Sequence, residues 1–322
     1  MTLSFTLRLL CLLTVLSGFI YAAAQLLLSL NARFILSRLE AATARRRECI
    51  LYLVQIAPLL LAIMIANAFC LPEYLRYEPT RETESVGWLC LLLAAAVVLW
   101  FVSTLVSGLR MALRTLDYVR ACQTSGHVIR HTSQSTPVLA LAEANPPFAL
   151  VGFMRPLILV SADLLEAGGL DADALRVALD HERSHAEHHD NWKLLSLSFL
   201  PRLPVDPWLW HWQRAADWAA DDDAVRGDSA RSLLLAQALV YTARAVRNSR
   251  PSVICATLTS AETGLAVRVG RLLHPPQPSR PAPASLHLGL VALLLLLAGA
   301  AVISFPWTIY SLFERILHLG GV

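Results

Sequence analysis

The sequence has few charged residues, and it lacks the patterns that several protein classes require. Charged residues make up 16% of the 322-residue chain, lysine occurs once, and the net charge is only +3. No basic patch with interleaved aromatic residues occurs, which argues against direct nucleic-acid binding. None of the six cysteines lies in a CxxC or zinc-finger spacing. No repeat of solenoid period is present either.

Long apolar segments are the most prominent feature of the chain. Hydrophobic residues make up 56% of it and the mean hydropathy is +0.52, above the usual range of soluble globular proteins. A transmembrane helix needs about 20 apolar residues. Four stretches are long enough: Leu9–Leu30, Cys49–Leu71, Trp88–Leu109 and Leu286–Tyr310. We therefore expect a mainly α-helical membrane protein with four transmembrane helices.

The first stretch has an alternative interpretation as a secretory signal peptide. Arg8 precedes the apolar run, and Ala22-Ala23-Ala24 resembles a cleavage site. The apolar run continues past these alanines, which favours an uncleaved membrane span.

The four stretches divide the chain into three parts. Residues 1–109 are predicted to form a three-span transmembrane bundle, and residues 110–285 the one large polar domain. Residues 286–322 are predicted to form the fourth transmembrane helix and a short tail. Prolines within residues 274–285 predict a stiff, extended linker at the end of the domain.

The distribution of basic residues predicts the orientation of the chain. Arginine is concentrated in the first loop and after the third span, at positions 33, 38, 45–47, 110, 114 and 120. Cytoplasmic loops are enriched in basic residues. We therefore expect a bacterial-type inner-membrane protein in contact with membrane lipids, with its large domain on the cytoplasmic side. Cys70 and Cys90 would then lie near the outer face, where a disulfide is permitted. Two small buried thiols are the favoured interpretation.

The motif that points to chemistry is HERSH at residues 181–185, an HExxH sequence. Residues four apart share one face of an α-helix, so His181 and His185 can bind one metal ion together. Zn²⁺ suits imidazole and carboxylate ligands and keeps a position open for water. Glu182 can act as a general base toward that water. Asp171 is a good N-cap for the helix, whereas the alternative is a solvated polar helix face.

A second polar helix is predicted over Ala215–Val225. Asp217 and Asp221 lie four residues apart and share a face of it. A zinc site built on HExxH needs a third protein ligand, which Asp217 can supply, while Asp221 can hydrogen-bond a ligating histidine. Asp222 and Asp223 fit the alternative interpretation, a solvated acidic run.

Short β-prone runs between residues 127 and 161 predict a small sheet just before the HExxH helix. An edge strand beside a protease site can bind an extended peptide by adding it to the sheet. The candidate edge is Phe148–Phe153, and its candidate substrate-binding residues are Phe148, Ala149, Leu150, Val151 and Gly152. An ordinary core strand is the alternative, and the sequence leaves the two open.

The chain resembles the BlaR/MecR-type membrane zinc metallopeptidases over most of its length. The residues behind the resemblance are Pro147-Phe148 with Gly152, Arg155-Pro156-Leu157-Ile158, the helix HERSHAEHHDNW at 181–192, and DWAADDDAV at 217–225. The resemblance implies an α+β, zincin-like domain between the third and fourth spans. It also implies that Asp190 supports a ligating histidine, because the family has an Asp five residues after the second His. Its expected substrate is a cytoplasmic regulatory protein, such as a transcriptional repressor, cleaved in a signalling response.

Two departures from the family pattern affect the expected chemistry. The third ligand is usually a Glu, and Asp217 is one methylene shorter, so its helix must approach the metal more closely. The antibiotic sensors of the family carry an outer β-lactam-binding domain with an SxxK serine, but the single lysine here is Lys193 and no outer domain is expected. Acylation by a β-lactam is therefore not expected. The extra His188 and His189 are expected to face solvent or support the site without binding metal.

The expected function is that of a membrane-embedded zinc endopeptidase. One alternative is a non-catalytic signalling membrane protein with a degenerate peptidase fold. The other is a membrane quality-control protease like the HtpX-type enzymes, which place two spans before the motif. The sequence leaves open the substrate, the activating signal and whether the chain forms a homo-oligomer.

Overall fold

The structure is a computed structural model of the chain. It describes residues 4–77, 86–129, 136–245, 255–257 and 264–274, apart from residues 143, 145–146, 167–168 and 205, and also Ser311 and Arg315. The fourth predicted transmembrane helix, Leu286–Tyr310, and residues 275–285 of the predicted linker lie outside the described residues.

Three helices are long and apolar enough to cross a membrane, at the positions of the first three predicted spans. They are α1 (Phe5–Leu30), α3 (Ala44–Ile65), which a π-helical turn extends, and α5 (Trp88–Ser125). Large apolar side chains point away from the bundle; Phe19 and Leu99, for example, are 71% and 69% exposed. Such surfaces are unfavourable in water and favourable against lipid chains. The chain is therefore a membrane protein by the length and composition of these helices.

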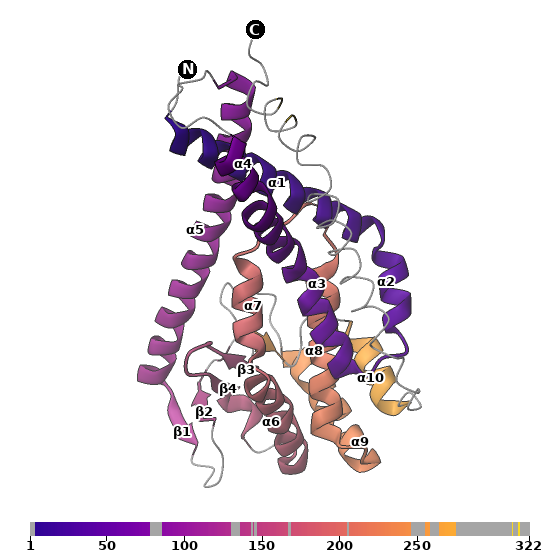
Figure 1. Cartoon of the computed structure of the whole chain (residues 1–322). Coiled ribbons are helices and arrows are strands. Elements are labelled where there is room, and N and C mark those ends of the chain that lie inside the picture. Colours follow the sequence, from indigo (N-terminus) through magenta and orange to yellow (C-terminus); the bar gives the residue numbers. More distant parts are fainter. Residues whose placement is uncertain are drawn as a thin grey trace.

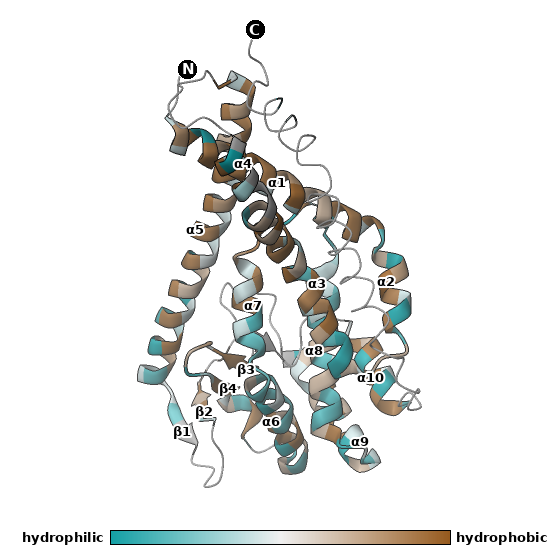
Figure 2. Cartoon of the chain, viewed as in Figure 1, coloured by the Kyte–Doolittle hydropathy of each residue, from teal (hydrophilic) through white to brown (hydrophobic). Residues whose placement is uncertain are grey.

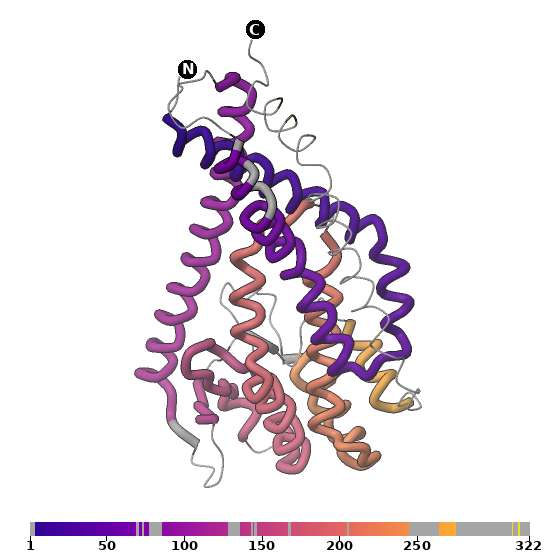
Figure 3. Tube along the Cα trace, in the orientation of Figure 1, coloured from indigo at the N-terminus to yellow at the C-terminus, as the bar shows by residue number. Residues whose placement is uncertain are grey.

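Helix α5 extends well beyond the predicted third span. Its 38 residues correspond to about 57 Å at 1.5 Å per residue, roughly twice the hydrocarbon thickness of a bilayer. It runs from the end of the molecule near the N-terminus down to β1 (Figures 1 and 3). Its upper part is mostly hydrophobic and its lower part more polar (Figure 2). One continuous helix thus joins the apolar end of the molecule to the sheet.

Short helices connect the long ones. α2 (Ala32–Leu39) follows α1, and α4 (Leu71–Tyr77) follows the π-helical turn Ala66–Cys70. Cys90, near the start of α5, is a buried free thiol, which agrees with the favoured interpretation of that cysteine.

A five-stranded sheet lies at the polar end of the molecule, where the β-prone runs predicted it. The strand order is β1-β2-β4-β3-β5, and only the β2–β4 pair is parallel. The strands are β1 (His127–Ile129), β2 (Val138–Leu141), β3 (Phe148–Val151), β4 (Leu157–Ser161) and β5 (Cys255–Thr257).

The prediction that Phe148–Phe153 forms a sheet edge is wrong. Strand β3 pairs with β4 on one side and with β5 on the other. All four of its residues are buried, so it is a core strand. Gly152 follows the strand with φ +87°, a left-handed conformation that glycine adopts without strain. The sequence could not reveal β5, because its three residues lie about a hundred positions further along the chain.

Side chains alternate between the two faces of the sheet, and helices cover both. Phe148, Leu150 and Ile158 face α6 (Ala172–Glu187) and α9 (Ser229–Ala245). Residues of the opposite face, such as Ala149 and Leu159, pack against Val119 and Cys122 of α5. The polar part of the molecule is therefore layered, with the end of α5, the sheet, α6 and α9 in that order.

The described part of the domain contains three further α-helices: α7 (Asp190–Ser198), α8 (Trp208–Val225) and α10 (Leu265–Leu273). Leu51 of membrane helix α3 shares a core with Trp208 and Trp212 of α8 and with Leu197 of α7. The predicted boundary between residues 109 and 110 also falls inside α5. The bundle and the polar domain are therefore joined by a continuous helix and a common core.

Candidate metal centre

Helix α6 begins where the sequence predicts and holds the HExxH motif. The side chain of Asp171 accepts a hydrogen bond from the Asp173 N–H at 3.2 Å, which confirms the predicted N-cap. His181, Glu182 and His185 are all buried, with at most 1% of each exposed. The motif therefore does not form a solvated helix face.

Asp217 of α8 joins the two histidines in one buried cluster. Ligand atoms of His181, His185 and Asp217 all lie within 4.8 Å of one another. The two Nε2 atoms are 3.2 Å apart, and His185 Nε2 is 3.7 Å from Asp217 Oδ1. The tertiary structure thus brings together the three residues that the sequence predicts as ligands.

The second nitrogen of each imidazole faces a carboxylate. His185 Nδ1 lies 2.7 Å from Asp190 Oδ2, and His181 Nδ1 lies 3.0 Å from Asp221 Oδ1. Both carboxylates lie where the sequence predicts them, but only the His185–Asp190 contact has hydrogen-bond geometry; Asp221 is at ion-pair distance from His181. Burial acts to lower the pKa of His185, but Asp190, Glu182 and Asp217 together raise it. With a proton on each Nδ1, both Nε2 atoms would be free to bind a metal ion.

A break in the helix brings Asp190 to His185. The segment 181–192, predicted as one helix, is two: α6 ends at Glu187, and His189 has φ 55° and ψ 37° before α7 begins at Asp190. On a continuous helix, side chains five residues apart point in different directions. The left-handed residue turns the chain so that Asp190 faces back to the motif. His189 itself is exposed.

Arg268 is a site residue that sequence reasoning missed. It is 1% exposed on α10, and it donates two hydrogen bonds to Asp221, at 3.0 and 2.6 Å. Its guanidinium also lies 3.5 Å from His181 Nε2 and 3.7 Å from Asp217 Oδ2. The available signal was helical spacing, because Arg268 falls on the apolar stripe of Leu265, Val269 and Leu272.

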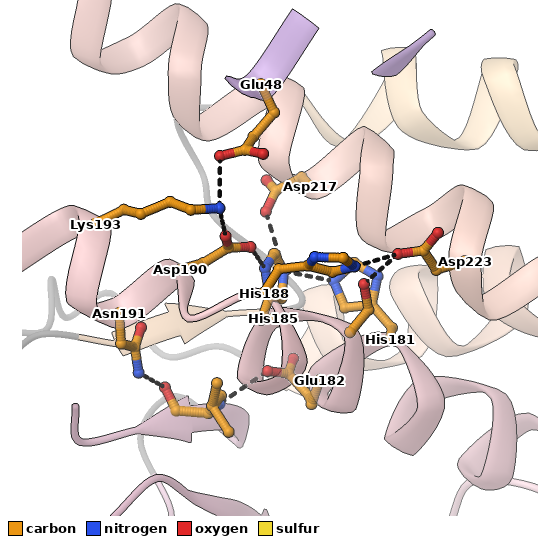
Figure 4. A network of polar contacts seen from close by, with 12 residues as sticks. Glu48, His181, Glu182, His185, His188, Asp190, Asn191, Lys193, Asp217 and Asp223 are labelled. Atoms are coloured by element: carbon orange, nitrogen blue, oxygen red, sulfur yellow. Dashed lines mark hydrogen bonds and ion pairs between the residues drawn. The ribbon is translucent and has the colours of Figure 1, made fainter. Parts of the chain in front are cut away.

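Glu182 is oriented by the backbone of β3. Its Oε2 accepts a hydrogen bond from the Leu150 N–H at 2.8 Å, and its Oε1 has no hydrogen-bond partner among the described residues (Figure 4). Asn191 donates to the carbonyl oxygens of Leu150 and Gly152 at 3.1 and 2.8 Å. The candidate substrate-binding strand is thus in contact with the site, although its polar backbone groups bind side chains of α6 and α7.

Burial and charge set the protonation of the cluster. Burial lowers the pKa of His181 to about 4, so this imidazole is neutral near pH 7. Burial raises the pKa of Glu182 to about 7, against the opposing effects of His185 and the Leu150 N–H. Burial acts to raise the pKa of Asp190, but the hydrogen bond and charge of His185 and the Lys193 cation lower it to about 2. Asp190 is therefore a carboxylate at neutral pH.

The donor set fits a zinc ion. Two neutral imidazoles and a carboxylate are ligands that zinc prefers, and tetrahedral bonds of 2.0–2.1 Å would place two nitrogen ligands about 3.3 Å apart. The observed Nε2–Nε2 distance is 3.2 Å. The two Nε2 atoms are therefore close enough to bind the same zinc ion.

Two of the three polar residues near the motif differ in part from expectation. Asp223, expected to be solvated, accepts hydrogen bonds at 2.6 Å from Ser184 of α6 and from Arg45 of α3. Asp222 is half-exposed but pairs with Arg271 at 2.7 Å. His188 lies 3.4 Å from Asp223 and outside the ligand cluster, as predicted.

Comparison with protein-family models finds no match for this chain, and comparison with curated proteins finds none either. The resemblance to BlaR/MecR-type metallopeptidases therefore stays a prediction from the motifs.

Proposed function

We propose that this chain is a membrane-embedded, zinc-dependent endopeptidase with a zincin-like domain. The observation that supports this best is the buried cluster of His181, His185 and Asp217, with Glu182 on the same turn of α6. Random polar residues on a solvated helix would not share one buried point with an acid from another helix. In this proposal the three clustered residues hold the zinc, and Asp221 and Asp190 fix the two imidazoles.

The chain's own residues supply the proton transfers of peptide hydrolysis. A bound zinc would polarise the scissile carbonyl and make an attacking water more acidic. Glu182 takes the proton of that water and later delivers it to the leaving amine, since its carboxylate is next to the cluster and its raised pKa suits both steps. The Leu150 N–H holds one carboxylate oxygen, which leaves Oε1 for the proton.

The arrangement of the helices supports a substrate on the cytoplasmic side. Helix α6, which carries His181 and His185, lies in the more polar part of the molecule, away from the apolar ends of α1 and α5 (Figure 2). With the orientation inferred from the arginines, this part lies on the cytoplasmic side of a bacterial-type inner membrane. By the resemblance, the substrate is a regulatory protein such as a transcriptional repressor, and cleavage is a step in signalling.

One observation favours a second candidate, a non-catalytic signalling protein with a degenerate peptidase fold. Asp217 stands where the family usually has Glu, and the Arg268 cation lies 3.7 Å from it. An ion pair of these two residues would stabilise the cluster without any metal.

Zinc content distinguishes the two candidates. We expect close to one zinc per chain in protein purified in detergent without chelators, and a large loss in Asp217→Ala. Glu182→Gln should retain the zinc and lose peptide cleavage. Wild-type protein that binds no zinc would favour the second candidate, and cleavage by Glu182→Gln would refute the proposed proton transfer.

A further inference from the structure

A line of charged side chains connects the candidate metal centre to membrane helix α3. Glu48 of α3 accepts a hydrogen bond from Lys193 Nζ at 2.9 Å, and the same Nζ donates to Asp190 Oδ1 at 2.9 Å. The other oxygen of Asp190 lies 2.7 Å from Nδ1 of His185. Figure 4 shows the four side chains in sequence, with Glu48 entering from α3.

We infer that Glu48 is a positioning residue of the metal centre, acting on His185 through Lys193 and Asp190. Membrane helix α3 is then a structural part of the site. This inference rests on the proposed function in one respect, namely that His185 binds the metal.

Burial makes each member of the line dependent on the next. Glu48 and Asp190 are 1% and 3% exposed, so each carboxylate needs a cation or donors to replace its lost hydration. Lys193, the one lysine of the sequence, stands between them and serves both. Without it, two buried carboxylates would face each other, and the orientation of Asp190 toward His185 would no longer be held.

Glu48 also contacts the helix that holds the third candidate ligand. The same Oε1 that binds Lys193 accepts a hydrogen bond at 3.0 Å from Trp212 of α8, five residues before Asp217. Arg45, one turn earlier on α3, lies 3.6 Å from Glu48 and donates to Asp223 of α8 at 2.6 Å. A displacement of α3 would therefore pull on both α7 and α8.

The position of Glu48 on α3 links the line of contacts to the membrane. Glu48 lies in the second turn of α3, which continues as an apolar helix capable of spanning the membrane. A change in the tilt or rotation of α3 in the bilayer would reach His185 through three polar contacts. Partners that orient a ligating histidine typically change metal affinity 10- to 100-fold when removed, so a contact one or two steps further out should matter about tenfold.

The test is zinc affinity of the full-length protein in detergent, measured by competition with a chromogenic chelator. Glu48→Gln, which removes the negative charge that pairs with Lys193 and keeps an oxygen for Trp212, and Lys193→Met should each weaken zinc binding about tenfold. The double variant should be no weaker than the worse single variant, because both changes break one line. The absorption spectrum of bound Co²⁺ reports the geometry of the ligands and should shift in both single variants. A general loss of stability would not change the spectrum of the folded, metal-bound protein.

Gln55 provides the matched control on the same helix. It is buried two turns further along α3, and its side-chain amide donates to Leu51 of its own helix. Gln55→Met should leave zinc affinity within twofold of wild type and the Co²⁺ spectrum unchanged.

Two other results would overturn the inference in distinguishable ways. Wild-type affinity and an unshifted Co²⁺ spectrum in Glu48→Gln and Lys193→Met, with weakened binding in Asp190→Asn, would end the line at Asp190 and leave the proposed function intact. Wild-type protein that binds neither zinc nor Co²⁺ would remove the proposed function and this inference with it.

Discussion

At the scale of single residues, the site contains carboxyl groups whose ionised forms are disfavoured by burial. Asp221 keeps a lowered pKa despite its burial because Arg268 and His181 contact it. Glu182 is held by one backbone N–H and has a raised pKa. The cluster is thus balanced by specific neighbours, and each neighbour can be removed separately.

Removing the charge of Glu182 should stabilise the metal-free protein at high pH. The pKa of Glu182 in the fold is about 7, above its ordinary value of 4.5, so the folded state binds this proton more tightly than the unfolded chain. The ionised group therefore costs stability that grows from about pH 4.5 and reaches roughly 3 kcal/mol above pH 7. Chelator-treated Glu182→Gln should melt at a higher temperature than wild type at pH 8 and at a similar temperature at pH 4. Equal differences at both pH values would contradict this.

Two arginines on α10 allow a buried ion pair and a more exposed ion pair to be compared for their contribution to stability. Arg268→Met leaves the buried Asp221 carboxylate without its cation and should lower the free energy of unfolding by about 3–5 kcal/mol. Arg271→Met, three residues further along α10, breaks an ion pair with the half-exposed Asp222. It should lower the free energy of unfolding by less than about 1 kcal/mol. Thermal and denaturant unfolding of both variants measures the contrast. Similar losses would mean that Asp221 does not depend on Arg268.

At the scale of secondary-structure elements, the break between α6 and α7 decides the geometry of the site. It lets Asp190 reach His185 and points Lys193 toward α3. His189 makes the break in a left-handed conformation, which costs about 1–2 kcal/mol for a residue with a Cβ atom.

The change in stability on substitution of His189 should depend on backbone conformation rather than on charge. His189→Gly relieves the left-handed strain and should raise stability by up to about 1 kcal/mol, while His189→Val should lower it by about 1–2 kcal/mol. Glu187→Gly, in the last turn of α6, is the control and should lower stability by about 1 kcal/mol. Unfolding midpoints measure all three, and a destabilised His189→Gly variant would show that the imidazole itself matters.

At the scale of the whole molecule, membrane helices and site form one unit. Leu51 of α3 packs with Trp208 and Trp212 of α8, and Glu48 is bonded to α7 and α8. The division at residue 109, which composition suggests, does not correspond to a division of the core.

A fragment of residues 110–274 should therefore not fold on its own. It would expose the apolar faces of α7 and α8 and leave Lys193 without Glu48. We expect an aggregating product with poor amide-exchange protection, compared with the full chain in detergent. A soluble fragment that melts cooperatively would show that the polar domain is independent of the bundle.

Features that depend on the local spacing of residues follow from the sequence alone. The first three apolar helices, the strands between residues 127 and 161, the N-cap at Asp171 and the HExxH face of α6 all follow from residues close together in the chain. Asp217 and Asp221 were also predictable, because their four-residue spacing places both on one face of α8.

Which distant groups meet these residues depends on how the helices and the sheet pack. Strand β5 covers β3, Arg268 enters the cluster from α10, and Glu48 reaches Lys193 across 145 positions of sequence. Such contacts leave no periodic pattern, since they depend on how whole helices pack. The same packing places Asp190, through one left-handed residue, beside the histidine that it supports.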